Sequence, residues 1–348
     1  MKAFAILPPP SLIHRVHAAM ASHAKFTVSW QNTPPAEAKD PAEMTFSEKR
    51  MSTLIDEANR PLLRIGIPKG SLQESTADLF QKAGYDLRVS DRSYFPSIDD
   101  PDMQCIMFRA QEMSRYVEDG VIDVGITGCD WVVENGSDVH EVCELAYSKA
   151  TSRPARWVLA VPEESSIHKP EDLAGGIVAT ELINATRQYF DERGINVRKV
   201  EFSWGATEVK ARLVDAIVDI TETGSSLRAN KLRVLDTVMS STTRLIANHA
   251  AWAEPARRGR IEDLALLLKG AIAARQKVGL KMNVPHNALE EISAMLPAEK
   301  SPTVSPLADG EWVAVEVIVE EATERELVPR LVRAGAVGII SYPLNKVI

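Results

Sequence analysis

The chain has 348 residues, of which 45% are hydrophobic and 25% are charged, a length and composition typical of a globular protein with two or three domains. Its 40 Lys and Arg residues against 48 Asp and Glu residues give a formal net charge of −8 at pH 7. This acidity argues against nucleic acid as a partner, because a dedicated nucleic-acid binder presents a basic surface. No run of about 18 apolar residues occurs, so the sequence predicts no membrane-spanning helix.

The N-terminal segment, residues 1–58, differs in composition from the rest of the chain. Residues 1–36 contain no Asp or Glu and are rich in proline. A basic leader without acidic residues is typical of an organellar transit peptide, which would direct the protein to a plastid. The alternative is a disordered extension, with Met51 as the true start of the chain.

The cysteines and histidines predict neither disulfides nor a protein-made metal site. The three cysteines form no CxxC pair, and the seven histidines show no metal-binding spacing. Free cysteines favour a reducing compartment, and we therefore expect a cytoplasmic protein. Cys129 has no histidine near it in the sequence to act as a base, so we do not expect it to be a nucleophile.

From Leu62 onward, short apolar runs alternate with amphipathic stretches, a pattern that predicts a mostly parallel α/β sheet. The expected strands are Leu62–Ile67, Met103–Phe108, Val121–Ile126, Trp157–Val161, Ile177–Ala179, Val197–Phe202 and Ala216–Ile220. The expected helices cover residues 72–83, 111–119, 184–193 and 207–214. These strands are too many for one small sheet. We therefore expect two lobes, joined near residues 152–154, with a ligand cleft at the carboxyl ends of the strands.

The last seventy or so residues have a pattern of their own. The expected order is strand Val278–Val284, helix His286–Met295, strands Pro302–Pro306 and Trp312–Val319, helix Thr323–Ala334 and strand Ala336–Tyr342. This βαββαβ order predicts a ferredoxin-like domain. No catalytic set of residues occurs in it, which favours a regulatory or oligomeric role.

The segment Leu213–Leu227 (LVDAIVDITETGSSL) predicts a phosphate-binding turn. An apolar strand delivers Asp219 and runs into a loop of Thr, Glu, Gly and Ser before a helical stretch. Backbone amides, hydroxyls and a helix N-terminus together favour an anion, and Asp219 can accept hydrogen bonds from ribose hydroxyls. The alternative is an ordinary strand–turn–helix connection, in which Gly, Ser and Thr are common.

Two further strand ends carry the same kind of chemistry. The segment 119–134 (DGVIDVGITGCDWVVE) ends a strand at Thr127 and Gly128, with Asp130 close behind. The segment 64–73 (RIGIPKGSLQ) places Lys69 after a strand, where its charge suits a polyphosphate, and Arg109 follows the strand MQCIMF. Taken alone, Lys69 has the alternative of a solvated loop lysine.

These segments resemble the ATP phosphoribosyltransferase family. The resemblance rests on IPKGSLQE, FRAQE, DVGITGCDWVVE, AVPEES and VDITETGSSLRAN in order, and on KMNVP and GIISYPLNKVI of the long form with a C-terminal domain. It covers roughly residues 62–348. Ser71 stands where the family commonly has arginine, and Lys210–Arg212 replaces the family's Gly-containing approach to the strand.

The resemblance implies the fold and the division of the chain. The fold implied is α/β, with a two-lobed catalytic part like that of periplasmic binding proteins and a ferredoxin-like, ACT-like C-terminal domain. Lobe I would comprise residues 59–153 with 247–274, lobe II residues 154–246, and the regulatory domain residues 275–348.

The resemblance also implies an activity: transfer of phosphoribosyl from phosphoribosyl diphosphate to N1 of ATP, the first step of histidine biosynthesis. The catalytic residues would be Lys69, Arg109 and Asp219. The phosphoribosyl diphosphate site would comprise Asp219, Glu222, Thr223, Gly224, Ser225, Ser226 and Leu227. The nucleotide site would comprise Gly70, Ser71, Thr127, Gly128 and Asp130. Trp131 and Trp157 have two alternatives, stacking on adenine or packing in the core.

Cofactor, effector and assembly are implied in the same way. Mg²⁺ would be bound to the substrate, with few protein ligands. Histidine would inhibit by binding the C-terminal domain, with Ser301 and Thr303 as contacts, and the chain would form a homo-hexamer built from dimers. The competing interpretation is a two-lobed binding protein for an anionic solute, without enzymatic activity.

Overall fold

The fold is described from a computed structural model, which covers residues 62–90, 93–147, 154–205, 207–297, 302–308 and 310–348. Contacts divide the chain into two units, residues 1–59 and 60–348, and the described residues belong to the second. The predictions for residues 1–58 and for Ser301 lie outside the described residues. Within those residues, no helix is long and apolar enough to cross a membrane.

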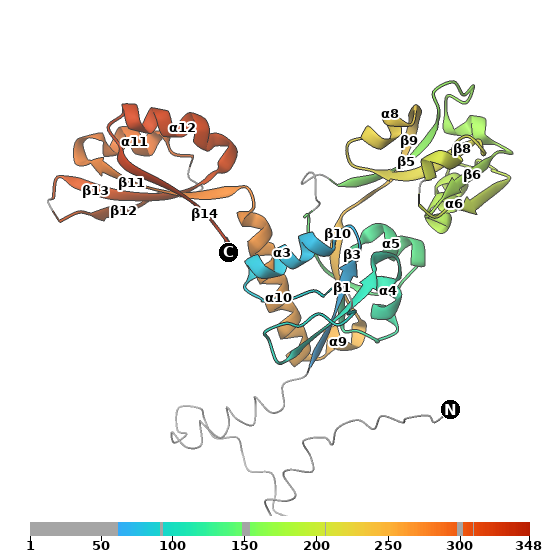
Figure 1. The fold of residues 1–348 in the computed structure, drawn as a ribbon, viewed down its shortest axis with the longest axis horizontal. Helices are drawn as coiled ribbons and strands as arrows, with labels where there is room; N and C mark the ends of the chain where they lie inside the picture. Colours follow the sequence, from blue (N-terminus) through green and yellow to red (C-terminus); the bar gives the residue numbers. More distant parts are fainter. Residues whose placement is uncertain (1–61, 91–92, 148–153, 206, 298–301, 309) are drawn as a thin grey trace, which may run out of the picture. The chain divides into compact units, whose positions relative to one another are not determined.

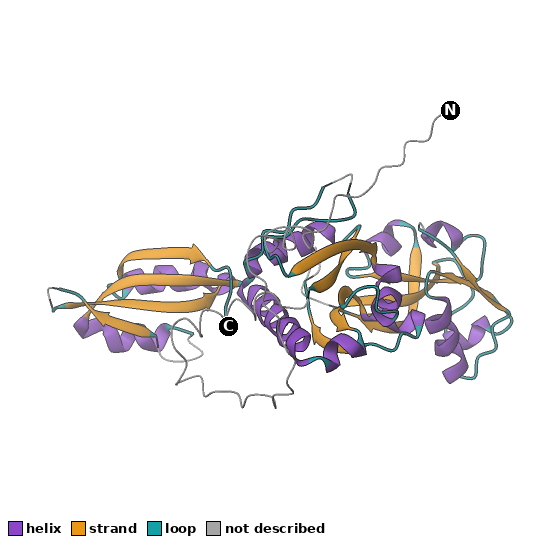
Figure 2. Ribbon diagram, turned by 90° about the horizontal axis from the view of Figure 1, so that it is seen from below, coloured by secondary structure: helices purple, strands orange, loops and turns teal. Residues whose placement is uncertain are grey.

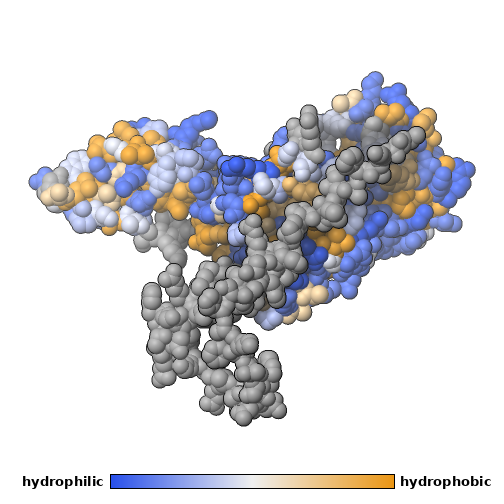
Figure 3. Space-filling view, turned by 60° about the horizontal axis from the view of Figure 1, so that its bottom comes forward, coloured by the Kyte–Doolittle hydropathy of each residue, from blue (hydrophilic) through white to orange (hydrophobic). Residues whose placement is uncertain are grey.

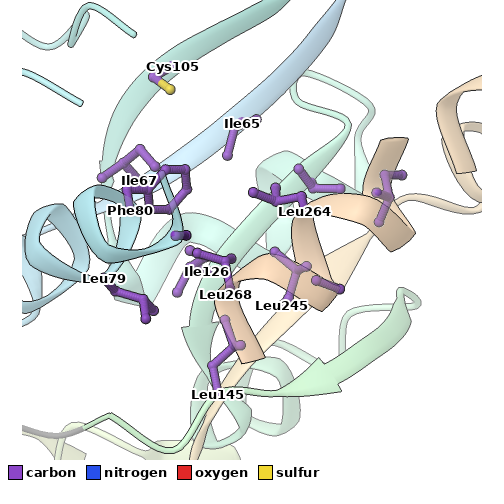
Figure 4. Close-up of a cluster of buried hydrophobic side chains, with 14 of the residues drawn as sticks. Ile65, Ile67, Leu79, Phe80, Cys105, Ile126, Leu145, Leu245, Leu264 and Leu268 are labelled. Carbon is purple, nitrogen blue, oxygen red and sulfur yellow. The ribbon is translucent and has the colours of Figure 1, made fainter. Parts of the chain in front are cut away.

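The first sheet has five strands in the order β2-β1-β3-β10-β4, and we call it, with its helices, lobe I. The strands are β1 (Leu63–Lys69), β2 (Met103–Arg109), β3 (Val124–Gly128), β4 (His140–Glu144) and β10 (Thr243–Ala247). The helices are α3 (Gln73–Ala83), α4 (Ala110–Glu118), α5 (Cys129–Asn135), α9 (His249–Ala253) and α10 (Pro255–Ala274). Buried side chains from β1, α3 and α10 meet in its core (Figure 4).

The second sheet also has five strands, in the order β7-β6-β8-β5-β9, and forms lobe II. The strands are β5 (Ala155–Pro162), β6 (Ile177–Thr180), β7 (Lys199–Phe202), β8 (Ala216–Thr221) and β9 (Leu232–Ser241). The helices are α6 (Ile183–Glu192), α7 (Thr207–Lys210) and α8 (Ser225–Ala229), with a short 3₁₀ turn at Pro170–Leu173. Figure 1 colours this lobe green to yellow.

The sheets are mostly parallel in strand direction, as predicted, but each contains one strand that runs opposite to the other four, β10 in lobe I and β5 in lobe II. In each sheet two strand pairs are parallel and two are antiparallel. Parallel neighbours need a crossover connection, usually a helix, whereas β9 runs almost directly into β10, from one sheet into the other. Thr243–Ala247 pairs with β3 and β4. Lobe I therefore resumes at Thr243, before residue 247, where the resemblance had placed the boundary.

The C-terminal domain has the predicted βαββαβ order, which confirms its ferredoxin-like fold. Its elements are β11 (Lys277–Pro285), a 3₁₀ turn at His286–Ala288, α11 (Leu289–Met295), β12 (Thr303–Pro306), β13 (Trp312–Glu320), α12 (Glu321–Arg333) and β14 (Val337–Pro343). The strands are ordered β12-β13-β11-β14, with every neighbouring pair antiparallel. Both helices cover the same face of this sheet (Figures 1 and 2).

Alternation along β13 explains which face is covered. Val313, Val315, Val317 and Val319 are all buried, while Glu316, Ile318 and Glu320 are exposed. Successive side chains of a strand point to opposite faces, so the four valines form the core beneath α11 and α12. In the view of Figure 3, hydrophobic and hydrophilic residues are interspersed on the surface of this domain.

Candidate active site

Lobes I and II line one cavity of about 330 Å³. Lobe I contributes the ends of β1, β2 and β3, and lobe II contributes the ends of β6 and β8. The lining includes Lys69, Gly70, Ser71, Leu72, Arg109, Gly128, Asp130, Tyr147, Trp157, Glu181, Asp219, Glu222 and Ser241. The cavity therefore lies at the carboxyl ends of strands, where open α/β sheets bind ligands and where the sequence predicted it.

The lobe I side of the cavity carries two cations. Lys69 ends β1, Arg109 ends β2, and the two residues are direct partners in the parallel pairing of these strands. Among the described residues neither is in an ion pair. Instead the Lys69 ammonium lies 3.8 Å from the centre of the Tyr94 ring, and the Arg109 guanidinium carbon lies 5.5 Å from that of Trp204. Two adjacent cations without carboxylate partners suit a polyphosphate.

The turn after β1 leads directly from these cations into helix α3. Gly70 has φ 108°, a left-handed conformation that favours glycine, and a Cβ there would meet only open space. Ser71 lines the cavity beside it and offers a hydroxyl where the family commonly has a guanidinium. The structure thus brings both predicted nucleotide residues of this turn to the cavity.

The turn after β3 carries a hydrogen bond between the two lobes. The buried Asp130 carboxylate accepts hydrogen bonds from Trp157 Nε1 at 2.6 Å and from the Trp131 amide at 3.1 Å. Burial raises the pKa of Asp130, which these hydrogen bonds oppose. Thr127 is fully buried and donates to the Ala110 carbonyl at 2.8 Å. Gly128 and Asp130 line the cavity, whereas the Thr127 side chain does not.

The lobe II side is acidic. Asp219 lies in β8, Glu222 follows that strand, and Glu181 follows β6. Burial raises the pKa of Asp219 to about 6, and the charges of Glu208 and Glu181 add to the effect. Glu222 Oε2 is buried without a hydrogen-bond partner among the described residues. Carboxylates held in this way can accept sugar hydroxyls or approach a bound cation.

The loop after β8 has the predicted turn geometry. Gly224 has φ 72°, and its amide donates to Thr221 Oγ1 at 2.8 Å. The hydroxyls of Thr223 and Ser225 lie 2.9 Å apart, and Ser226 donates to Glu208. These side chains are exposed at the rim, outside the residues that line the cavity.

The backbone of α8 begins directly after this loop. Its first helical hydrogen bond runs from the Arg228 amide to the Gly224 carbonyl, so the three preceding amides remain available to an anion. Leu227 is 2% exposed and packs in the core of lobe II, so only its backbone can reach a ligand.

Trp157 is buried and packs edge-on against Trp131, so the core-packing alternative holds for Trp157. Two other aromatic residues of the site, Trp204 and Tyr147, have no counterpart in the sequence prediction. Trp204, by contrast, is 56% exposed and faces Arg109, and Tyr147 lines the cavity. The signal for Trp204 was an apolar aromatic in a Ser-Trp-Gly loop, while Tyr147 follows a strand that the pattern did not reveal.

The C-terminal domain has a pocket of its own, of about 650 Å³. Thr303, the first residue of β12, lines it with Pro302, Glu316 and Tyr342. The Tyr342 hydroxyl donates to Glu316 on the same sheet. The structure thus puts Thr303, one of the two predicted effector contacts, at a pocket.

Two lobes with a cation-bearing rim, a carboxylate-bearing rim and a Gly/Ser/Thr loop are typical of the class of proteins that bind phosphorylated sugars and nucleotides in a cleft. The family model described as "ATP phosphoribosyltransferase" matches residues 109–270, and the one described as "HisG, C-terminal domain" matches residues 274–346. The chain belongs to the ATP phosphoribosyltransferase family, in the long form that carries a C-terminal domain. It is therefore a pentosyltransferase.

Individual relatives agree with this assignment. The ATP phosphoribosyltransferase of Prosthecochloris aestuarii is 58% identical over 292 residues, covering 84% of this chain and 99% of the relative. That of Pelodictyon phaeoclathratiforme is 57% identical over 295 residues, covering 84% and 100%. Among solved structures, a chain of the ATP phosphoribosyl transferase (HisG:HisZ) complex from Thermotoga maritima is 27% identical. It matches with a TM-score of 0.52, covering 61% of this chain and 98% of that one. The binding-protein alternative is therefore not retained.

Proposed function

We propose that this cavity catalyses attack of adenine N1 of ATP on C1 of phosphoribosyl diphosphate. The N1–C1 bond forms while the C1–oxygen bond breaks, and pyrophosphate leaves with the bonding electrons. The observation that carries the proposal is the pairing of two chemistries across one cavity, Lys69 and Arg109 on lobe I against Asp219 and Glu222 on lobe II. The product, phosphoribosyl-ATP, is the first intermediate of histidine biosynthesis.

The reaction needs charge stabilisation more than acid–base catalysis. Adenine N1 has a free lone pair at neutral pH, so no enzyme nucleophile is required. In the transition state the ribose carries positive charge, which the carboxylates of Asp219 and Glu222 would stabilise. The departing pyrophosphate gains negative charge, which Lys69 and Arg109 would stabilise. Groups already oriented toward developing charge supply the largest part of catalysis in such sites.

The two substrates would divide between the lobes. Phosphoribosyl diphosphate suits the loop of lobe II, where the amides that follow Gly224 can hold its 5′-phosphate and Asp219 can accept from its ribose hydroxyls. ATP suits lobe I, where the Lys69–Leu72 turn and Arg109 can hold its phosphates. Trp204 lies beside Arg109 and offers a flat apolar surface for the purine ring.

Mg²⁺ fits the site as an ion bound to the substrate. Among the described residues no group of three or more His, Cys, Asp or Glu side chains is arranged to hold a metal. The carboxylates of Asp219 and Glu222, the latter with its buried oxygen, supply the hard oxygen atoms that Mg²⁺ prefers beside substrate phosphates. When bound, the ion would neutralise charge on the leaving pyrophosphate.

Regulation, assembly and location follow from family membership as further parts of the proposal. Histidine would bind the C-terminal domain at the pocket that Thr303 lines and inhibit the enzyme, and the chain would assemble as a homo-hexamer built from dimers. The three cysteines are all free, which supports the cytoplasm.

The test is an assay of the full-length protein with ATP, phosphoribosyl diphosphate and Mg²⁺. We expect an N1-ribosylated adenine nucleotide and pyrophosphate in equal amounts, and inhibition when histidine is added. ATP without phosphoribosyl diphosphate serves as the control. Absence of both products from folded protein would overturn the proposed function. Product formation that histidine does not inhibit would remove only the proposed regulation.

A further inference from the structure

Helix α3 touches two distant parts of the molecule, the turn that lines the cavity and the C-terminal domain. Its N-terminus follows Leu72, a cavity residue, and its last residue is Ala83. Contacts at its two ends and along its side therefore lie between the C-terminal domain and the cavity.

At the N-terminal end, three residues form a buried chain of hydroxyl hydrogen bonds. Thr76 Oγ1 donates to the Leu72 carbonyl at 2.7 Å, and the Tyr147 hydroxyl lies 2.7 Å from Thr76 Oγ1. A threonine hydroxyl has one proton, and Thr76 donates it to the Leu72 carbonyl. Tyr147 must therefore be the donor in its hydrogen bond with Thr76. Burial raises the pKa of Tyr147, which keeps that proton in place.

This chain fixes the turn that precedes the helix. The Leu72 carbonyl also accepts the Thr76 amide at 2.9 Å, the first helical hydrogen bond of α3. Thr76 is fully buried and Tyr147 is 2% exposed, so water cannot replace either hydroxyl without a cost. The Leu72 carbonyl, at the end of the Lys69–Leu72 turn, is thus bonded to a hydroxyl that Tyr147 contacts in turn.

Along its side, α3 meets the junction between lobe I and the C-terminal domain. Arg275 directly follows α10 as its C-cap, two positions before β11 begins. Its guanidinium carbon lies 5.5 Å from the centre of the Tyr147 ring, and its Nη2 lies 3.7 Å from Asp78 of α3. Arg275 therefore contacts both the tyrosine and the helix from the domain junction.

At the C-terminal end, the last residues of the chain hold α3 and α10. Lys346 donates to the Ala83 carbonyl at 2.7 Å, one of the last carbonyls of the helix, which have no partner within it. The Val347 amide donates to the Gly270 carbonyl at 3.0 Å. Ile348 packs so closely on Gly270 that a Cβ there would come within 2.7 Å.

We propose that Tyr147 is a positioning residue for the Lys69–Leu72 turn, and that helix α3 couples this turn to the C-terminal domain through Arg275 and Lys346. This inference rests on the proposed function, because it names the path by which the C-terminal domain would act on the nucleotide side of the cavity. Movement at the junction or the C-terminus would reach the substrate turn as a shift of α3 and of the Tyr147–Thr76 pair.

The first test removes single hydroxyls and separates the two substrates. For Tyr147→Phe and Thr76→Val we expect the KM for ATP to rise about fivefold to tenfold, with the KM for phosphoribosyl diphosphate unchanged. Thr76→Ser keeps the hydroxyl, so its KM for ATP should stay close to the wild-type value. The matched control is Tyr189→Phe, which removes a tyrosine hydroxyl bound to Asp236, away from the cavity.

These kinetic results can contradict the inference directly. Equal changes in both KM values for Tyr147→Phe, or the same pattern for Tyr189→Phe, would mean that the hydroxyl acts only on stability. A KM for ATP in Thr76→Ser as high as in Thr76→Val would have the same meaning.

The second test needs no activity. In the full-length protein without ligands, Arg275→Gln and Lys346→Met should speed hydrogen exchange of the Gln73 and Thr76 amides, the hydrogen-bonded amides of this turn, about twofold to fivefold. This is the range of one lost cation–π contact for Arg275 and of one lost hydrogen bond for Lys346. Arg258→Gln is the matched control, since Arg258 lies in α10, the helix that Arg275 follows, and stacks on a different ring, that of Trp252, at 4.7 Å.

The outcomes distinguish this inference from the proposed function. Unchanged exchange in Arg275→Gln and Lys346→Met would refute the coupling even if the enzyme is active. Faster exchange in these variants, but not in Arg258→Gln, would support the coupling even if the wild type makes no phosphoribosyl-ATP.

Discussion

Lobes I and II have the same sheet, strand for strand, and opposite chemistry at the cavity. Each sheet has three parallel strands, then one that runs opposite to them, then one that runs with them again: β2-β1-β3, β10 and β4 in lobe I, and β7-β6-β8, β5 and β9 in lobe II. Lobe I presents Lys69 and Arg109 to the cavity, whereas lobe II presents Asp219 and Glu222. The shared topology determines where a ligand binds, and the residues after each strand determine which ligand it is.

The two lobes also differ in how their rims are stabilised. The cations of lobe I lie beside aromatic rings, and the turn that follows Lys69 is connected to the Tyr147 hydroxyl through Thr76. On lobe II, burial raises the pKa of Asp219, and the nearby carboxylates of Glu208 and Glu181 add to the effect. If this division is functional, a substitution on either rim should affect one substrate far more than the other.

The largest effect should come from the cations. For Lys69→Met and Arg109→Met we expect kcat/KM to fall about 10²- to 10³-fold, because each removes a charge that stabilises the transition state. Lys82→Met, in the last turn of α3 and paired with Asp78 at 3.6 Å, is the control and should change kcat/KM little. Steady-state kinetics with both substrates measure this. A loss in Lys82→Met as large as in Lys69→Met would show that charge at this cavity is not the cause.

The next effect should fall on phosphoribosyl diphosphate alone. Gly224→Val places a β-branched residue at φ 72° with a Cβ only 2.9 Å from Arg228, which distorts the loop of lobe II. We expect the affinity for phosphoribosyl diphosphate to fall about 100-fold or more, with ATP binding unchanged.

The matched control for that variant is Gly194→Val. Gly194 has φ 65° in the same lobe, with open space around it. Both variants should lose about 1–2 kcal/mol of unfolding free energy from backbone strain. Weaker phosphoribosyl diphosphate binding in Gly194→Val would mean that lowered stability, and not the loop, is responsible.

The pH dependence of binding should sharpen the role of Asp219. The carboxylate is present above its pKa of about 6 and is lost as the pH falls through that value. We expect the ratio of wild-type to Asp219→Asn affinity for phosphoribosyl diphosphate to be constant above about pH 7 and to fall below pH 6. Titration of the phosphates affects both proteins equally and cancels in the ratio. A ratio that stays flat from pH 5 to pH 8 would exclude an ionised Asp219 from the binding site.

The smallest effect should be that of Trp204. For Trp204→Ala we expect the KM for ATP to rise about threefold to fivefold, and for Trp204→Phe less, since a ring remains to stack on the purine. Phe202→Ala, another exposed aromatic 6.1 Å away, is the control. An equal change in Phe202→Ala would place the effect in the loop as a whole.

The sequence predicted the strand ends of the site because each combines an apolar run with a small-residue turn. Lys69, Arg109 and Asp219 all follow or end such runs, and the structure brings them to one cavity. The reversed direction of two strands, β5 and β10, could not be predicted in this way. β9 is a half-exposed strand without a continuous apolar run, and it leads directly into β10 of the other sheet.

Side-chain roles that depend on tertiary contacts were also beyond the sequence. Leu227 lies inside the phosphate-loop motif, yet its side chain belongs to the core. Tyr147 lies in no motif and gains its role only because folding brings it to Thr76, 71 residues away in the chain. The Thr127 hydroxyl likewise donates a hydrogen bond to the Ala110 carbonyl, a contact that the sequence of the turn does not reveal.

The division of the substrates between the lobes is tested most directly by calorimetric titration of each substrate onto three proteins: the wild type, Lys69→Met and Gly224→Val. We predict a crossed pattern, in which Lys69→Met weakens ATP far more than phosphoribosyl diphosphate, while Gly224→Val does the reverse. If each variant weakens both substrates equally, the two lobes do not hold separate substrates and the account is contradicted.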